Sequence, residues 1–176
     1  MDIRDLERSE LSRVGEIDRT ERIDVRFAQK GTELVAQLGK WNSGAWDPDG
    51  EGEHSVEEQR RALAYYAAAG GIARGAFATD RLVGIGMVVP HIRPAVAQLA
   101  YLHVSLAFRS TGIGSRLSDD LEMIARSAGD TEIVVTATPS ENTVRFYLGR
   151  GYQPMAQPFA ELFEREPDDI HMRKVI

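Results

Sequence analysis

A glycine-containing turn between an apolar segment and an amphipathic one constrains the fold more than any other feature of this sequence. The segment AQLAYLHV (97–104) has the length and composition of a buried strand, and Leu117 and Leu121 follow it at helical spacing. Arg-Ser-Thr-Gly-Ile-Gly (109–114) lies between them. Glycines let the backbone approach a ligand closely, and a helix N-terminus offers unpaired N–H groups at the positive end of its dipole. The junction therefore predicts a strand, a tight turn and a helix that can hold a pyrophosphate.

The remaining segments predict a mixed sheet with helices on its faces. Short apolar runs bounded by turn residues indicate strands, and apolar residues spaced by three or four indicate helices. The predicted order is a strand at 1–6, a helix around 11–17, a hairpin at 23–38, a loop at 39–53, a helix from 55 to 70, strands at 72–79, 82–89 and 97–104, a helix from 114 to 129, a strand at 131–138, a helix at 141–148, and strands at 152–155 and 170–175. This order is typical of an α/β chain built on one sheet.

The segment inserted after the first helix carries its own local signals. Gly31 can supply the positive φ of a tight turn, which predicts the hairpin. Trp41 and Trp46 then stand among glycines and acids without a regular period, which indicates a long loop. The spacing of Ser55 and Glu58 fits a capping box and predicts the start of the next helix.

Composition and charge exclude several classes of function. The 176 residues contain no cysteine, which rules out disulfides, Cys-ligated metal sites and acyl-cysteine chemistry. A net charge of -6 disfavours nonspecific attraction to nucleic-acid phosphates. No apolar stretch approaches the roughly 18 residues of a membrane span, and the charged N-terminus does not fit a signal peptide. We expect one cytoplasmic domain over residues 1–176, without metal, nucleic-acid or membrane partners.

Two motifs together make the chain resemble the Gcn5-related N-acetyltransferase (GNAT) superfamily. The acetyl-CoA signature of this family follows its fourth strand and consists of Arg or Gln, any two residues, Gly, any residue, and Gly or Ala. Here it reads RSTGIG (109–114). A second family signature, an Asn followed by an aromatic hydroxyl and a Gly-aromatic turn, matches Asn142, Tyr147 and the pair Gly151-Tyr152.

The resemblance covers residues 71–152 and, through the order of elements, both ends of the chain, but not residues 23–53. It implies the GNAT fold, an α/β (α+β) architecture with a central mixed, mostly antiparallel sheet and helices on both faces. The hairpin and loop after the first helix are then an insertion. The resemblance also implies an N-acetyltransferase that uses acetyl-CoA as cosubstrate.

The same resemblance implies where acetyl-CoA binds. Backbone groups of the strand at Leu102 and Val104 would pair with the pantetheine arm as an added strand does, and the turn would hold the pyrophosphate. Asn142 would contact the arm, unless it only starts a helix. Tyr147 would donate a proton to the departing CoA thiolate, unless it is only a core aromatic. The candidate cofactor-binding residues are Leu102, Val104, Arg109, Ser110, Thr111, Gly112, Ile113, Gly114, Ser115, Asn142 and Tyr147, and the candidate catalytic residue is Tyr147.

The implied reaction is direct attack of a neutral amine on the thioester in a ternary complex. A backbone N–H near Val104 would stabilise the oxyanion, and a base or a water relay must first deprotonate the amine. Because side chains alternate along a strand, those of Gln98, Ala100 and Leu102 should lie on the same face as that of Val104. None of these is a base, although Gln98 could orient a water, and His103 would point to the other face. The general base therefore stays unassigned.

The expected acceptor is a small molecule with a primary amine. Residues 47–58 carry six acids and no Lys or Arg close to Trp41 and Trp46. They would attract a cationic amine if they bordered the acceptor pocket, although a solvated acidic loop is the simpler explanation. Alternatives are a protein or peptide N-acetyltransferase and a noncatalytic acyl-CoA-binding regulatory module. Dimers are common among similar proteins, so a homodimer is also considered.

Overall fold

A seven-stranded sheet forms the centre of the protein in a computed structural model that describes residues 1–176. Its strands follow the order β1-β4-β5-β6-β7-β9-β8. All neighbours are antiparallel except β6 and β7, which are parallel. The strands are β1 (Asp2–Asp5), β4 (Ile72–Ala78), β5 (Arg81–Arg93), β6 (Val96–Val104), β7 (Glu132–Ala137), β8 (Gln153–Pro154) and β9 (Ile170–Val175). The predicted mixed, mostly antiparallel sheet is confirmed.

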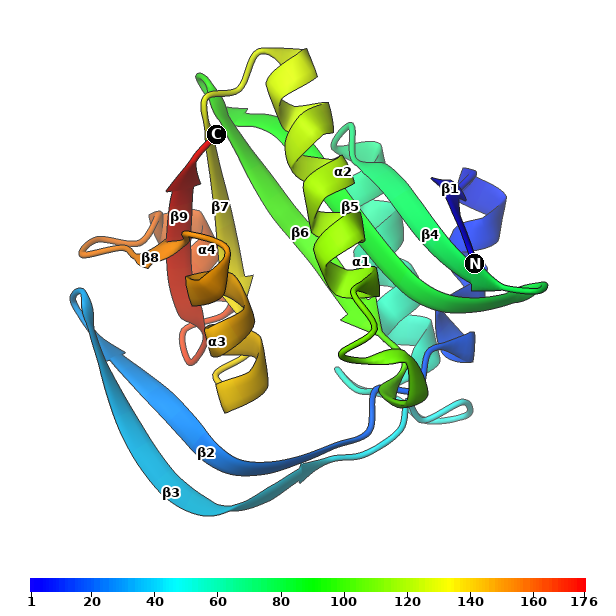
Figure 1. Ribbon diagram of the computed structural model, residues 1–176, viewed down its shortest axis with the longest axis horizontal. Helices are drawn as coiled ribbons and strands as arrows, with labels where there is room; N and C mark the ends of the chain where they lie inside the picture. Colours follow the sequence, from blue (N-terminus) through cyan, green and yellow to red (C-terminus); the bar gives the residue numbers. More distant parts are fainter.

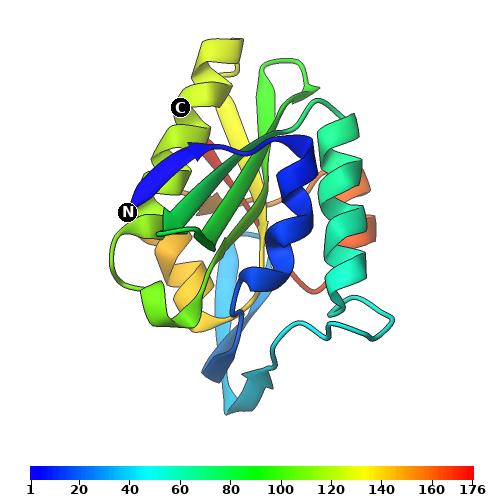
Figure 2. The same cartoon turned by 90° about the vertical axis from the view of Figure 1, so that its right-hand side faces the viewer.

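Helices cover both faces of the sheet, as Figure 2 shows. The 3-10 helix η1 (Arg8–Glu16) and the helix α1 (Val56–Ala68) lie on one face. The other face carries α2 (Ile113–Ala128) and α3 (Glu141–Gly149). The short helix α4 (Ala160–Arg165) lies beside α1, where the Arg165 guanidinium stacks over the ring of Tyr65. A single 3-10 turn, η2 (Leu106–Phe108), links β6 to the turn before α2.

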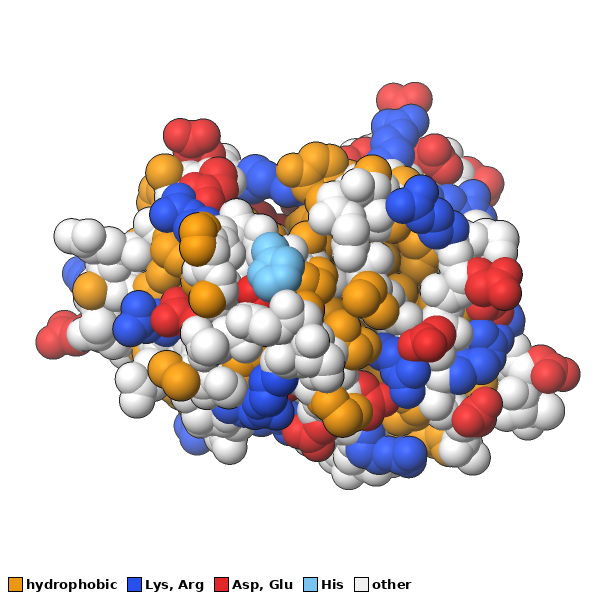
Figure 3. All heavy atoms as spheres, turned by 90° about the horizontal axis from the view of Figure 1, so that it is seen from above, with side chains coloured by type: hydrophobic (Ala, Val, Ile, Leu, Met, Phe, Trp, Pro, Cys, Tyr) orange, Lys and Arg blue, Asp and Glu red, His pale blue; other side chains and the backbone are white.

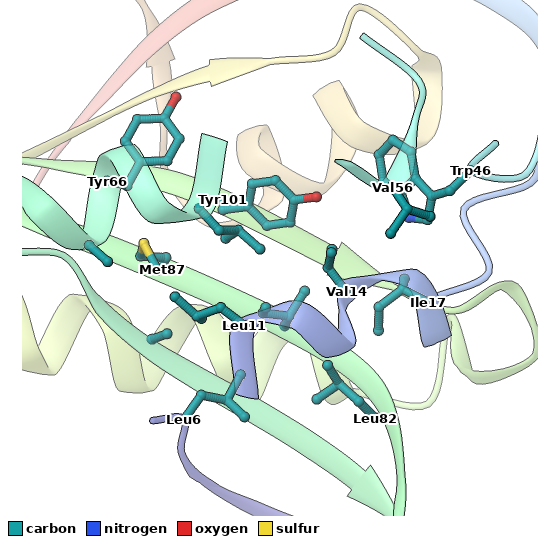
Figure 4. Close-up of a cluster of buried hydrophobic side chains, with 14 of the residues drawn as sticks. Leu6, Leu11, Val14, Ile17, Trp46, Val56, Tyr66, Leu82, Met87 and Tyr101 are labelled. Carbon is teal, nitrogen blue, oxygen red and sulfur yellow. The ribbon is translucent and has the colours of Figure 1, made fainter. Parts of the chain in front are cut away.

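The amphipathic helices bury their apolar side chains on both faces of the sheet. Leu117 and Leu121, which predicted α2, are fully buried against the sheet. On the opposite face, Leu11 and Val14 of η1 point towards β5 and β6, as Figure 4 shows. Burial of such side chains is the main stabilising term for these helices, because short helices are marginal on their own.

The inserted segment forms a ribbon separate from the main sheet. The strands β2 (Glu21–Lys30) and β3 (Glu33–Ser43) pair with each other and cross below α3 and the end of β6, as Figure 1 shows. The predicted turn is confirmed, and Gly31 has a φ of +60°. The predicted loop begins later than expected, because Trp41 pairs with Ile23 inside the ribbon.

Capping explains where the helices begin and end. The Ser55 hydroxyl accepts a bond from the Glu58 N–H at 3.1 Å, which confirms the predicted N-cap. The Ser55 N–H donates to the Gly52 carbonyl instead of the Glu58 carboxylate, so only this half of the predicted capping box forms. Gly129 ends α2 in the left-handed conformation. The sequence prediction missed α4 and η2, which are too short to show a helical period, and β8 is shorter than predicted. No helix in the protein has both the length and the apolar character required to cross a membrane.

Candidate active site

The edge of β6 that faces β7 is paired only at its start. β6 and β7 pair at Val96–Gln98 with Glu132–Val134, and no pairing follows these residues. Figure 1 shows the two strands separating towards their C-terminal ends. The backbone of residues 99–104 on this side, called here the open edge, can therefore bind an extended ligand as an added strand would. Leu102 and Val104, predicted to meet the pantetheine arm, lie on the open edge.

β6 contains a bulge at the start of the open edge. Met87 pairs with Tyr101 and Val88 pairs with Leu99, so Ala100 is an extra residue without a partner in β5. A bulge interrupts the alternation of side chains between the two faces. Tyr101 therefore packs on the η1 and α1 side, as Figure 4 shows, while Leu99 packs on the α2 side.

This bulge corrects the predicted faces of β6. Simple alternation assigns Gln98 and Ala100 to the face of Val104, and this prediction is wrong. Gln98 pairs with Val89, which packs in the core on the α1 side, and Ala100 packs against that same core. Val104 and Leu102 pack on the α2 side, so of the three positions only Leu102 keeps its predicted face.

The turn before α2 leaves the N-terminus of the helix open. Gly112 is the N-cap residue and has a φ of +88°, which glycine adopts without strain. No side chain caps the helix, and no acidic residue lies in its first turn. The N–H groups of Ile113, Gly114 and Ser115 thus have no intrahelical partner. A pyrophosphate fits this position, because unpaired N–H groups and the positive dipole end both favour an anion.

Gly114 lies where α2, β6 and α3 meet. A Cβ atom placed on Gly114 would lie 3.7 Å from Val104 Cγ2 and 3.5 Å from Phe146 Cε2. α3 carries Asn142 and Tyr147. The fold therefore brings the two sequence motifs to the same end of β6, although α2 and β7 separate them along the chain.

Glu21, at the start of β2, joins the two motifs directly. Its carboxylate accepts bonds from Arg109 Nη1 at 3.3 Å and from Asn142 Nδ2 at 3.0 Å. Arg109 also donates to the Val104 carbonyl at 3.1 Å and to the Arg19 carbonyl at 3.2 Å. The side chains of two predicted cofactor-binding residues are thus bonded within the protein. Sequence analysis missed Glu21, because only the folded ribbon brings it to this place.

Three further members of the predicted set lie in the turn or in the first turn of α2. Ser110 has a φ of +60°, and the Thr111 hydroxyl donates to the Phe108 carbonyl at 2.6 Å. Ile113 is 2% exposed and anchors the first turn of α2 in the core. A ligand at this turn would contact mainly backbone groups. The binding roles of these three residues remain predictions.

Tyr147 lies in the core between α3 and the sheet. It is 4% exposed, and its ring packs edge-on against Phe146 at 5.1 Å and Tyr152 at 5.2 Å. Its hydroxyl has no hydrogen-bond partner within the chain. Burial raises the pKa of the Tyr147 phenol, so the group keeps its proton at neutral pH. The position suits a packing role, and proton donation stays a prediction.

His103 does not supply the missing base. It lies on the η1 and α1 side of β6, with its ring 4.8 Å from that of Tyr101 and 5.4 Å from that of Trp46. Burial, followed by the charges of Arg19 and Arg109, lowers the pKa of His103 to about 4. Its imidazole is therefore neutral at pH 7 and too weak a base to take a proton readily from an alkylammonium group.

A cavity of about 540 Å³ lies between the ribbon and the C-terminal part of the chain. One wall comes from residues 26–29 of β2, with Gly31 and Gln37, and the other from residues 155–171. Sequence analysis assigned no site here, because the walls come from opposite ends of the sequence.

At another end of the molecule, Figure 3 shows acidic and basic side chains intermingled without a continuous basic band.

The open edge of β6 and the uncapped N-terminus of α2 suit an extended ligand that carries phosphate groups. The family model described as "Acetyltransferase (GNAT) family" matches residues 35–152. The chain belongs to the GNAT family and is an acetyl-CoA-dependent N-acetyltransferase.

Solved structures of acetyltransferases share this fold. Nourseothricin acetyltransferase is 14% identical, with a TM-score of 0.72 and coverage of 99% of this chain and 97% of that chain. PaiA N-acetyltransferase from Thermoplasma acidophilum, solved with coenzyme A, is 18% identical, with a TM-score of 0.62 and coverage of 99% and 98%. Aminoglycoside 6'-acetyltransferase type Ii is 23% identical, with a TM-score of 0.63 and coverage of 99% and 97%. No curated protein matches this chain in sequence.

Proposed function

We propose that the protein transfers the acetyl group of acetyl-CoA to a primary amine of a small molecule, by direct attack in a ternary complex. The observation that carries the proposal is the meeting of the open edge of β6 with the uncapped N-terminus of α2. Leu102 and Val104 would align the pantetheine arm through their backbone groups, and residues 109–115 would hold the pyrophosphate. The Asn142 side chain would give up its bond to Glu21 and contact the pantetheine arm instead.

The chain would promote the reaction by position and by proton transfer. Acetyl-CoA brings the activated acetyl group as a thioester, and the new N–C bond forms as the C–S bond breaks. A backbone N–H near Val104 would stabilise the oxyanion. Tyr147 would give its proton to the leaving sulfur and regain one from water, while the proton of the amine leaves through a water relay. The chain has no cysteine to form an acyl-enzyme, which favours direct transfer.

A small acceptor is supported by the ribbon and by the proteins that share the fold. The ribbon and the C-terminal segment line a partly open cavity of a size typical of small-molecule sites. Two of the similar structures are named for nourseothricin and for aminoglycosides. A protein or peptide acceptor would instead need an open groove, and it remains the second candidate.

Thiol release from acetyl-CoA tests the proposal. Purified protein is mixed with acetyl-CoA and a panel of amino acids, polyamines, aminoglycosides, nourseothricin and peptides. We expect release that depends on one of the small amines, and a drop in kcat of about tenfold or more for Tyr147→Phe, the size of effect typical of a lost general acid. Tyr65→Phe, an exposed tyrosine on α1, is the matched control.

Three outcomes would change the proposal. Release only with peptides would move the acceptor to the protein class. Acetyl-CoA binding without release across the panel would favour a noncatalytic module. Equal kcat values for Tyr147→Phe and the unchanged protein would leave Tyr147 as a core aromatic only.

A further inference from the structure

The outer strand of the ribbon has an unpaired edge. β3 pairs only with β2, and no isolated bridge uses it. Figure 1 shows β3 along the margin of the molecule. Its residues 34–38 (LVAQL) include no charged residue and no proline. Proteins commonly protect an edge with charges, prolines, bulges or a covering segment, because unpaired N–H and C=O groups attract further strands. This part of β3 lacks such protection, so a further strand is expected beside it.

The register of the ribbon shows which backbone groups are free. The Phe27 N–H donates to the Pro139 carbonyl at 2.8 Å, so it points away from β3. Phe27 pairs with Ala36. Opposite residues of an antiparallel pair exchange both backbone bonds or none, so Ala36 turns its N–H and C=O away from β2 as well. The alternation of the ladder extends this to Leu34 and Leu38. The backbone groups of these three β3 residues are called here the ribbon edge.

The side chains of the ribbon edge are apolar, and one of them is almost fully exposed. Leu34, Ala36 and Leu38 point to the same face of the ribbon, because side chains alternate along a strand. Leu34 packs against the core beneath α3, whereas Ala36 is exposed. Leu38 is 85% exposed, more than any other large hydrophobic side chain of the protein. Burial of this leucine by a neighbouring strand would be favourable.

A second copy of this chain fits the ribbon edge. Two identical antiparallel strands related by a two-fold axis form a self-complementary contact. With the axis beside Ala36, Ala36 meets itself, and Leu34 of each copy meets Leu38 of the other. Every free backbone group then has a partner, and the exposed Leu38 side chain packs against Leu34 on the same face. A shift of the axis by one residue would place Leu34 or Leu38 opposite a residue outside the segment 34–38.

The charges at the two ends of this segment favour the same arrangement. Glu33 precedes it, and Lys40 follows it after Gly39. Antiparallel pairing brings Glu33 of each copy opposite Gly39 of the other, next to Lys40. Opposite charges therefore meet at both ends, whereas parallel strands would bring like charges together. A bulge at Gly39 and Lys40, which together oppose the single residue Asp24, ends the regular part of the edge.

We infer that two copies of the protein pair through their ribbon edges, antiparallel about a two-fold axis beside Ala36, and form a four-stranded sheet across a homodimer. Val35 of the second copy would then lie opposite Gln37, which lines the cavity between the ribbon and the C-terminal segment. The second copy would thus extend one wall of that cavity. This pairing does not depend on the proposed acetyl transfer.

Disulfide cross-linking tests the register, because the chain has no cysteine of its own. In Ala36→Cys the two Cα atoms would lie about 5.5 Å apart, within the range of a disulfide. In Leu38→Cys, the matched control, they would lie about 14 Å apart. Both positions are exposed, so chance collisions would cross-link both variants. With oxidised glutathione as oxidant, we expect Ala36→Cys to form the covalent dimer at least about tenfold faster.

Sedimentation velocity measures the dimer without a cross-link. We expect the average mass to rise towards twice that of the chain between about 1 μM and about 500 μM, because a small interface is weak. Ala36→Pro removes an N–H of the ribbon edge, spares the bonds between β2 and β3, and should leave a monomer with an unchanged melting temperature. Leu38→Lys should weaken the dimer about tenfold or more. Met123→Lys, which places the same charge at an exposed methionine of α2, should not.

The outcomes separate this interface from other contacts. A monomer at the highest concentration, or equal cross-linking of the two cysteine variants, would overturn the inference. A dimer that persists in Leu38→Lys, or that weakens equally in Met123→Lys, would place the contact on another face and overturn it as well. Leu38→Lys decides alone if Ala36→Pro lowers the melting temperature. Selective cross-linking of Ala36→Cys together with loss of the dimer in Leu38→Lys would support the inference.

Discussion

Asp169 is a carboxylate that the fold surrounds mainly with like charge. Its raised pKa, about 7 against an ordinary value near 4, means that the folded state favours the protonated form. The stabilisation that this provides is complete below the unfolded pKa and is lost as the pH rises through the folded pKa. The protein therefore carries an unfavourable ionised group at pH 8.

Asp169→Asn should consequently raise the unfolding free energy more at pH 8 than at pH 5. The difference should be on the order of 1 kcal/mol, after a discount for partial exposure to solvent. Urea unfolding at the two pH values measures it. Asp24→Asn should show no such pH dependence, and an Asp169→Asn curve parallel to that of the unchanged protein would contradict the raised pKa.

Sequence reasoning identifies some residues of the site and misses others for a physical reason. The turn at 109–114 can be predicted from the sequence, because a strand, glycines and a helix follow one another along the chain. Glu21 and Asp169 carry no local signal, since their surroundings come from β2 and from the segment after β8. His103 can be recognised in the sequence as a candidate base, but its pKa depends on burial and on the charges of Arg19 and Arg109, which only the fold brings to it.

At the scale of the element, the base of the ribbon holds a negative charge beside the expected phosphate site. The Glu21 carboxylate bonds to Arg109 and Asn142 next to the turn that leads into α2. Glu21→Gln keeps the shape of the side chain and removes its charge. We expect the variant to bind CoA about threefold more tightly, because the repulsion between a carboxylate near the surface and the CoA phosphates is worth less than about 1 kcal/mol.

Calorimetry at low and high salt measures this effect, which salt should shrink. Glu33→Gln, at the exposed far end of the ribbon, is the control. Weaker CoA binding in Glu21→Gln would mean that the carboxylate positions Asn142 and Arg109 for the ligand rather than opposing it.

The side chain of Gln29 bonds the tip of the ribbon to the C-terminal segment. Gln29 bonds to Met155, His171 and Gly31, and a neutral hydrogen bond contributes about 1 kcal/mol. Gln29→Ala should lower the unfolding free energy by about 2 kcal/mol and speed hydrogen exchange in β2 and β3 but not in α2. Gln37→Ala, an exposed glutamine of β3, should change neither. Unaltered exchange in Gln29→Ala would show that other contacts fix the ribbon.

Most helices and strands can be predicted from the sequence, and the exceptions lack a regular pattern of polar and apolar residues. Period and turn residues locate α1, α2 and the strands of the main sheet. Alternation does not reveal the bulge at Ala100, because AQLAYLHV is largely apolar and residues of both faces are buried. α4 spans fewer than two turns of helix, so no apolar stripe marks it.

On the scale of the whole molecule, Glu122 connects α2 to the C-terminal strands. It is 3% exposed, and its carboxylate meets Lys174 Nζ at 2.6 Å, Arg150 Nη2 at 3.5 Å and the Tyr152 hydroxyl at 3.4 Å. Removing one partner of a buried ion cluster leaves the other charges uncompensated. Glu122→Gln should therefore lower the unfolding free energy by about 3 kcal/mol.

Denaturant titration checks this expectation. The control is Glu141→Gln, which removes an exposed pair with Arg145 and should change stability by less than about 0.5 kcal/mol. Equal stability of the two variants would mean that the attraction within the Glu122 cluster only offsets the free-energy cost of burying its charges.

The ribbon leaves and rejoins the chain at the same point, since Glu21 pairs with Ser43 across its base. A segment with adjacent ends can be exchanged without moving the scaffold that carries it. One wall of the cavity proposed for the acceptor belongs to this segment. Under that proposal, the residues that bind acetyl-CoA and those that select the acceptor would lie in different stretches of the sequence. We then expect that a foreign ribbon grafted between Glu21 and Ser43, with both of these residues kept, changes the acceptor of the enzyme and leaves its donor unchanged.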